Sequence, residues 1–171
     1  MGNNNSNYTI LRVTPTLDTN AYAQGDVLFT ATAIPNAVRG DGGCSKLLAM
    51  YVVDQADGSD NDIMFVFSEG STALGTINAT ANISDGDLEA LNICGIAFND
   101  GSAASTGAHI DTARIHQVLP ASVSEESAFQ TQLLQAAAGT TSVYVQGILT
   151  GTSTPTYAAD DIDLIFHIQY K

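Results

Sequence analysis

Four aspartates lie close together in one segment, and they are the strongest chemical feature of the sequence. Asp54, Asp57, Asp60 and Asp62 fall within nine residues that also contain glycine, serine and asparagine. Carboxylates gathered in this way could bind calcium, a hard cation that prefers oxygen ligands, although the spacing is not that of an EF-hand. The alternative is a solvated hairpin turn, because Asp, Gly, Ser and Asn favour turns. Both interpretations stay open, with calcium as the weaker candidate.

A second group of carboxylates lies near the end of the chain, at Asp160, Asp161 and Asp163. The residues from this point onward alternate between apolar and polar types, which is typical of a half-buried strand. Successive side chains of a strand point to opposite faces of the sheet. We therefore expect Asp161 and Asp163 on the outward face of this strand, with Ile162 and Leu164 turned inward.

The sequence contains no pattern that is typical of an enzyme. It lacks the GxSxG motif and the P-loop, and His109, His116 and His167 fall in no metal-ligand or triad-like motif. We expect His116 and His167 to lie on a sheet face or at an interface. Cys44 and Cys94 form no CxxC pair and are too few for a disulfide framework, so we expect buried free thiols. We predict a non-enzymatic protein without a cofactor or a metal ion, apart from the calcium candidate.

Short segments with the residue types of β-strands recur along the chain, separated by turn residues. We expect strands at 8–14, 26–31, 46–54, 62–68, 93–98, 113–119, 142–148 and 161–170. Segment 62–68 is apolar on both faces, which predicts burial on both sides or cover by a partner. For residues 124–138 we favour a loop or short helix followed by a strand, with a longer helix as the alternative.

One short helix is expected at 84–91, because Ser84 is a good N-cap and acidic residues follow in the first turn. The glycine-rich segment 38–43 and residues 99–107 are expected to be loops. Many short strands with little helix are typical of a sandwich or jelly roll. We predict an all-β protein: a flexible polar N-terminal tail, 1–7, and one antiparallel, jelly-roll-like β-sandwich domain, 8–171, with one or two helical turns.

The charge of the chain excludes some partners. The 18 acidic and 5 basic residues give a net charge of −13, which repels nucleic acid and anionic membranes. Charged residues make up only 13% of the chain, about half the usual share. A surface with few charges suits close contact with other proteins, because little charge has to be desolvated. No apolar run approaches the length of a membrane span.

Several segments resemble an uncharacterised family of virion structural proteins of tailed phages, including phages of marine bacteria and cyanobacteria. The similar segments follow the expected order along nearly the whole chain: 14–19, 22 with 25–29, 34–39, 62–67, 74–76, 140–147 and 154–157. None of them is a catalytic motif. The resemblance implies a particle component without enzymatic activity.

Within that class, the resemblance favours a capsid decoration, or cement, protein. Such a protein implies a homotrimer that binds the major capsid protein on the outer capsid surface. It would be made in the host cytoplasm and would then join the virion. Neither nucleic acid nor a membrane is an expected partner.

Two other functions stay open at this stage. A tail-associated or receptor-binding virion module would also be rich in β-structure, but it would bind glycans through exposed aromatic side chains, and the chain has no tryptophan. A jelly-roll carbohydrate-active protein would need two carboxylates in a cleft. The sequence does not exclude such a pair.

Overall fold

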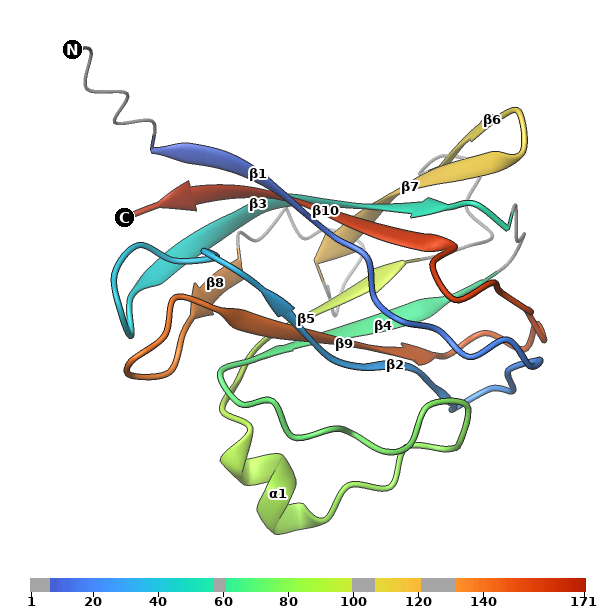
Figure 1. Ribbon diagram of the computed structural model, residues 1–171, viewed down its shortest axis with the longest axis horizontal. Coiled ribbons are helices and arrows are strands. Elements are labelled where there is room, and N and C mark those ends of the chain that lie inside the picture. Colours follow the sequence, from blue (N-terminus) through green and yellow to red (C-terminus); the bar gives the residue numbers. More distant parts are fainter. Residues whose placement is uncertain (1–6, 57–60, 100–106, 121–131) are drawn as a thin grey trace, which may run out of the picture.

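The computed structural model describes residues 7–56, 61–99, 107–120 and 132–171. Ten strands and one short helix make up this part of the chain (Figure 1). The elements are β1 (Tyr8–Val13), β2 (Val27–Ile34), β3 (Cys44–Asp54), β4 (Ile63–Ser68), α1 (Asp85–Ala90), β5 (Ile93–Asn99), β6 (Gly107–Ile110), β7 (Ala113–Pro120), β8 (Gln132–Gln135), β9 (Val143–Leu149) and β10 (Ile162–Tyr170).

The strands pair in a nested order along the chain. Strand β1 pairs with β10, β2 with β9, β3 with β7 and β4 with β5, and every pair is antiparallel. Together, the paired strands resemble one long antiparallel ribbon. This ribbon is rolled into two packed layers, β1-β10-β3-β7 and β2-β9-β4-β5 (Figure 1). Nested antiparallel pairing in two layers is the arrangement of a jelly roll. The predicted fold class, an all-β antiparallel sandwich of the jelly-roll kind, is confirmed.

Strand β7 joins the two layers. Residues Arg114 to Val118 pair with β3, whereas Leu119 and Pro120 pair with β5 in the other layer. Two further strands extend the first layer: β6 forms a hairpin with β7, and β8 pairs with the first residues of β3. The ten strands therefore form one continuous hydrogen-bonded network.

The main core fills the space between the two layers. Four alternate residues of β10, namely Ile162, Leu164, Phe166 and Ile168, are fully buried in it. The ring of Phe166 meets the ring of Phe67 from β4 edge to face, with centroids 6.1 Å apart. This alternation is the pattern that predicted strand 161–170, and it explains why the sandwich forms.

A second, smaller core lies on the far side of the β2-β9-β4-β5 layer. The connection from β4 to β5, which includes α1, packs over that face (Figure 1). Val66 of β4 is buried there against Leu74 and Leu91. Gln146 of β9 is also buried, and its side chain accepts a hydrogen bond from the backbone N–H of Leu74 at 2.9 Å. The expectation that segment 62–68 is covered on both faces is therefore confirmed.

Helix α1 begins as the sequence predicts. The Ser84 side chain caps it by accepting a hydrogen bond from the backbone N–H of Asp87 at 3.2 Å. No helix among the described residues is long and apolar enough to cross a membrane. Residues 1–6 of the predicted tail, 100–106 of the predicted loop 99–107 and 121–131 lie outside the described residues, so the expectations for them stay predictions. The two described ends of that predicted loop are strand residues, Asn99 in β5 and Gly107 in β6.

The strand bounds lie within three residues of the predicted ones, and one described strand, β6, has no predicted counterpart. Strand β6 was not expected, because Gly107 and Ala108 are weak strand formers and the segment reads as the end of a loop. Its hairpin partner β7 supplies the hydrogen bonds that its own residue types do not predict. Strand β8 falls within the ambiguous segment 124–138, in agreement with the favoured interpretation of its second half.

Candidate interaction surface

The acidic turn after β3 is built partly from buried polar groups. Asp54 is only 3% exposed, and its carboxylate accepts a hydrogen bond from the backbone N–H of Ala56 at 2.9 Å. The Asn61 side chain donates to the hydroxyl of Tyr157 at 2.8 Å and accepts from the hydroxyl of Ser153 at 2.9 Å. These bonds tie the turn between β3 and β4 to the loop before β10.

The geometry gives the calcium hypothesis little support. Asp54 is buried in a turn-forming role and Asp62 is half-buried, while Asp57 and Asp60 lie outside the described residues. Across the part of the chain that the structure describes, no three His, Cys, Asp or Glu side chains gather closely enough to hold a metal ion. The hairpin-turn interpretation accounts for the contacts of Asp54 without a cation.

The prediction that Asp163 lies on the outward face of its strand is confirmed, but its side chain is covered there. Asp163 does point away from the main core, but it is only 2% exposed. Arg12 of β1 forms an ion pair with it, Thr14 donates a hydrogen bond, and the Gln55 side chain donates another at 3.2 Å. Burial by itself would raise the pKa of Asp163, but the bonds from Arg12 and Thr14 outweigh it, so the pKa is lowered.

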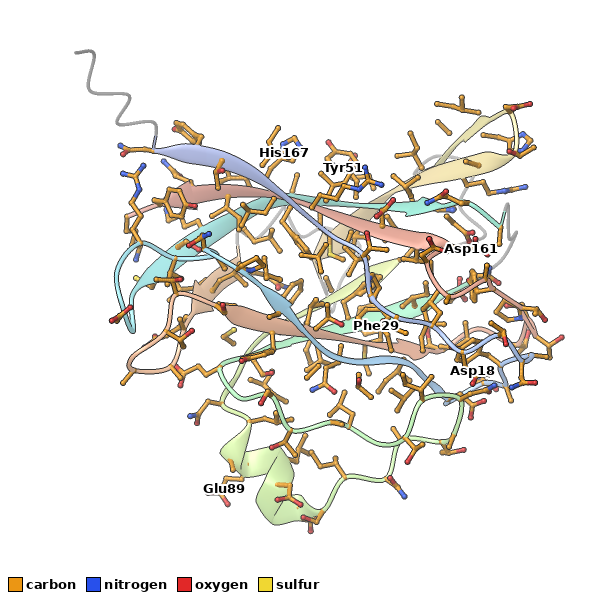
Figure 2. All side chains as sticks on the ribbon, viewed as in Figure 1. Asp18, Phe29, Tyr51, Glu89, Asp161 and His167 are labelled. Atoms are coloured by element: carbon orange, nitrogen blue, oxygen red, sulfur yellow. The ribbon has the colours of Figure 1, made fainter. Side chains whose placement is uncertain are left out.

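The three histidines occupy different environments. His116 of β7 is 3% exposed and faces the main core opposite Val52. Burial, and secondarily the charge of Arg114, lowers the pKa of His116 and favours its neutral form. His167 lies on the outward side of β10, beside the ring of Tyr51 at a centroid distance of 5.3 Å (Figure 2). His109 is exposed in β6.

The two cysteines are free, as predicted, but they are half-buried rather than buried. Burial raises the pKa of the Cys94 thiol, which keeps it protonated and unreactive. The described histidines and cysteines come from five different strands, β3, β5, β6, β7 and β10.

The most unusual surface is the outward side of the β1-β10-β3-β7 layer together with β6 and β8, which we call the open face. The strand register assigns its residues: side chains opposite the buried ones on each strand point outward. Most of these outward positions are apolar: Tyr8, Ile10, Leu48, Ala49, Tyr51, Val53, Ala108, Ile110, Ala113, Ile115, Leu133 and Ile165.

Exposure confirms that apolar side chains gather on the open face. Of the seven large apolar side chains that are exposed among the described residues, four belong to it: Tyr8 at 58%, Ile10 at 65%, Ile110 at 58% and Leu133 at 43%. Isolated exposed apolar residues are ordinary, but a contiguous apolar area marks a site of interaction. The outward apolar side chains of the open face come from hydrogen-bonded neighbouring strands, so they are grouped on one side of the molecule.

A shallow groove of about 360 Å³ lies in the open face where β1, β10 and β3 run side by side. The register between β10 and β3 shifts at this point, between His167 and Ile168. The shift leaves Leu48 without a direct partner on β10. The lining residues are Tyr8, Thr9, Ile10, Leu48, His167 and Ile168. A groove lined in this way would hold an apolar side chain.

Charge is distributed unevenly between the open face and the rest of the molecule. Among the outward positions of its described strands, Asp163 is the single carboxylate, and Arg12 pairs with it. Arg12 and Lys46 are two of the five basic residues of the whole chain. Figure 2 shows Glu89 on the opposite side of the sandwich, and Asp18 and Asp161 at one end of it. The open face is therefore apolar and slightly basic in an acidic protein.

The two outer sides of the sandwich differ in one further respect. The chain covers the outer side of the β2-β9-β4-β5 layer with its own β4–β5 connection. Nothing in the described residues covers the open face in the same way, as Figure 1 shows. The sequence does not signal this difference, because β3 and β10 contain apolar residues on both faces, as at Val53 and Ile165, and so does β4, whose outer face the chain covers.

Neither a family model nor a curated protein matches the sequence.

Proposed function

We propose that this chain is a non-enzymatic structural protein of a tailed-phage virion, namely a capsid decoration protein that binds the outer capsid surface as a homotrimer. The observation that carries the proposal is the open face, an apolar surface that no described segment of the chain covers. A protein with such a face gains stability by joining an assembly.

The fold supports the same proposal. Jelly rolls are common in viral capsid proteins, and also in lectins. A fold does not by itself define a function. The proposal therefore also rests on the segment-by-segment resemblance to virion proteins and on the open face. The acidic turn around Asp54 offers no comparable support for a carbohydrate-active enzyme, since its carboxylate is engaged in the turn.

The physical role of a decoration protein follows from added interface area. Subunits that bridge neighbouring capsomers stabilise the assembled shell over its separated parts by mass action. The major capsid protein is the expected partner, together with further copies of this chain. A net charge of −13 keeps free subunits soluble in the host cytoplasm before assembly and disfavours contact with nucleic acid.

Quantitative mass spectrometry of purified particles of the encoding phage tests this proposal. We expect the chain to be present in a copy number comparable to the number of capsomers. A few copies for each particle would favour a tail-associated module instead, and absence from the particle would contradict the proposal.

Particles that lack the chain provide a functional test. We expect them to release DNA at a lower temperature than complete particles, and we expect the purified chain to restore the difference when it is added back. An unrelated acidic protein of similar size serves as the control. No difference between the two kinds of particle would count against a stabilising role.

A further inference from the structure

We infer that the open face is the surface through which copies of this chain bind one another. The inference deepens the homo-oligomer part of the proposed function and rests on it. Three properties of the open face support the inference: the apolar side chains of the face, the charge of the face and the absence of any cover from the described chain.

The fold covers the apolar outer side of one layer and leaves that of the other layer exposed. On the β2-β9-β4-β5 layer, Val66 and its neighbours are shielded by Leu74 and Leu91 from the β4–β5 connection. On the open face, Ile10 and Ile110 stay more than half exposed. Removing such side chains from water is favourable at about 25 cal/mol for each Å² of apolar area. A partner would supply there the shielding that the chain supplies on the other side.

The distribution of charged residues limits the surfaces through which two copies of this acidic chain can meet. Two copies that each carry −13 repel one another, and this repulsion falls off over about 10 Å at moderate ionic strength. Contact through α1 would bring Asp85, Asp87 and Glu89 against the neighbour's charges. Contact through the open face brings no unpaired carboxylate of its described strands into the interface, because Arg12 neutralises Asp163. A second copy therefore meets less repulsion at the open face than at α1.

The open face carries both a groove and exposed apolar side chains that could fill such a groove. The groove beside His167 is lined by Ile10 and Leu48 and is open to solvent. Ile110 and Leu133 are exposed apolar side chains of the same face. Side chains of this kind can fill such a groove. Because groove and projecting side chains belong to one face, copies arranged around a symmetry axis can each offer both parts.

Sedimentation velocity of the purified full-length chain over a range of concentrations tests the inference. We expect the wild type to form a discrete oligomer and Ile10→Asp to dissociate at least tenfold more readily, because it places a carboxylate in an apolar contact. Leu88→Asp is the matched control, since Leu88 is an exposed apolar residue on α1, away from the open face. We expect that variant to assemble as the wild type does.

Salt provides a second readout. Raising sodium chloride from about 50 mM to about 500 mM should strengthen the self-association, because it screens the repulsion between acidic copies. Circular dichroism checks that Ile10→Asp is folded, and Gln117→Lys, at an exposed position of β7 on the same face, replaces it if it is not.

Three results would overturn the inference. The first is a wild type that stays monomeric at about 100 µM, far above a micromolar dissociation constant. The second is an oligomer that remains intact in the folded open-face variant, Ile10→Asp or its replacement Gln117→Lys. The third is equal dissociation of Ile10→Asp and Leu88→Asp. A monomeric wild type that binds capsids and loses binding with Ile10→Asp would assign the open face to the capsid protein. That result would overturn self-association while leaving the virion proposal standing, whereas absence from the particle would end the virion proposal without deciding the oligomeric state.

Discussion

Arg12 of β1 and Asp163 of β10 form an ion pair across two neighbouring strands, and it covers a carboxylate that is almost fully buried. The pair removes the negative charge that the open face would otherwise present. It also joins the edge strand β1 to the centre of its layer, beyond the backbone hydrogen bonds of the register.

Asp163→Asn should reduce the free energy of unfolding at pH 7 by about 1–3 kcal/mol, because buried hydrogen bonds to a charged group are strong. Asp160→Asn, at an exposed position in the preceding loop, should have little effect. Chemical denaturation of both variants beside the wild type provides the measurement.

The same variant predicts a dependence on pH. Since the pKa of Asp163 is lower in the folded than in the unfolded chain, its stabilising contribution is present above about pH 4 and is lost as the pH falls through the folded pKa. The difference between wild type and Asp163→Asn should therefore shrink in acid. A difference that stays constant down to low pH would contradict this account of the ion pair.

Gly147 of β9 lies directly beneath the ring of Phe29. A Cβ at Gly147 would overlap this ring, with the Phe29 Cζ only 2.9 Å away. Gly147→Ala should therefore lower the free energy of unfolding by about 1–3 kcal/mol through overpacking. Gly86 lies in α1 with open space around it, so Gly86→Ala should raise stability by about 0.5–1 kcal/mol. Thermal melting of the pair would contradict the packing account if both changes had the same sign.

The turn after β3 should depend on its hydrogen bonds rather than on calcium. Asn61→Ala removes bonds to Tyr157 and Ser153 and should lower the free energy of unfolding by about 1–3 kcal/mol, whereas the exposed Asn7→Ala should not. Added calcium should leave the melting temperature unchanged and release no heat in titration. A calcium-dependent rise in melting temperature that is lost in Asp62→Asn would restore the metal site.

The strands could be predicted from sequence because each carries its own local signal. Alternation placed β10, and two apolar faces on segment 62–68 predicted that both sides of β4 are buried. Strand β6 escaped prediction because its hydrogen bonds depend on β7 and its residues are weak strand formers. Alternation assigned Asp163 to the correct face, but it could not show that Arg12, which is distant in sequence, covers the carboxylate there.

The open face could not be predicted from any one segment. Ile10, Tyr51 and Ile165 become neighbours only through the register of β1, β10 and β3, which joins opposite ends of the chain. The jelly-roll class was accessible from the number and type of the strands. The nested pairing that brings these side chains together required the structure.

A cryo-electron-microscopy reconstruction of the purified particle tests the central claim most directly. The account predicts density for this jelly roll on the outside of the shell, in groups of three at junctions between capsomers, with the open faces turned toward one another. A bare outer shell, with the chain located on the tail or missing from the particle, would contradict it.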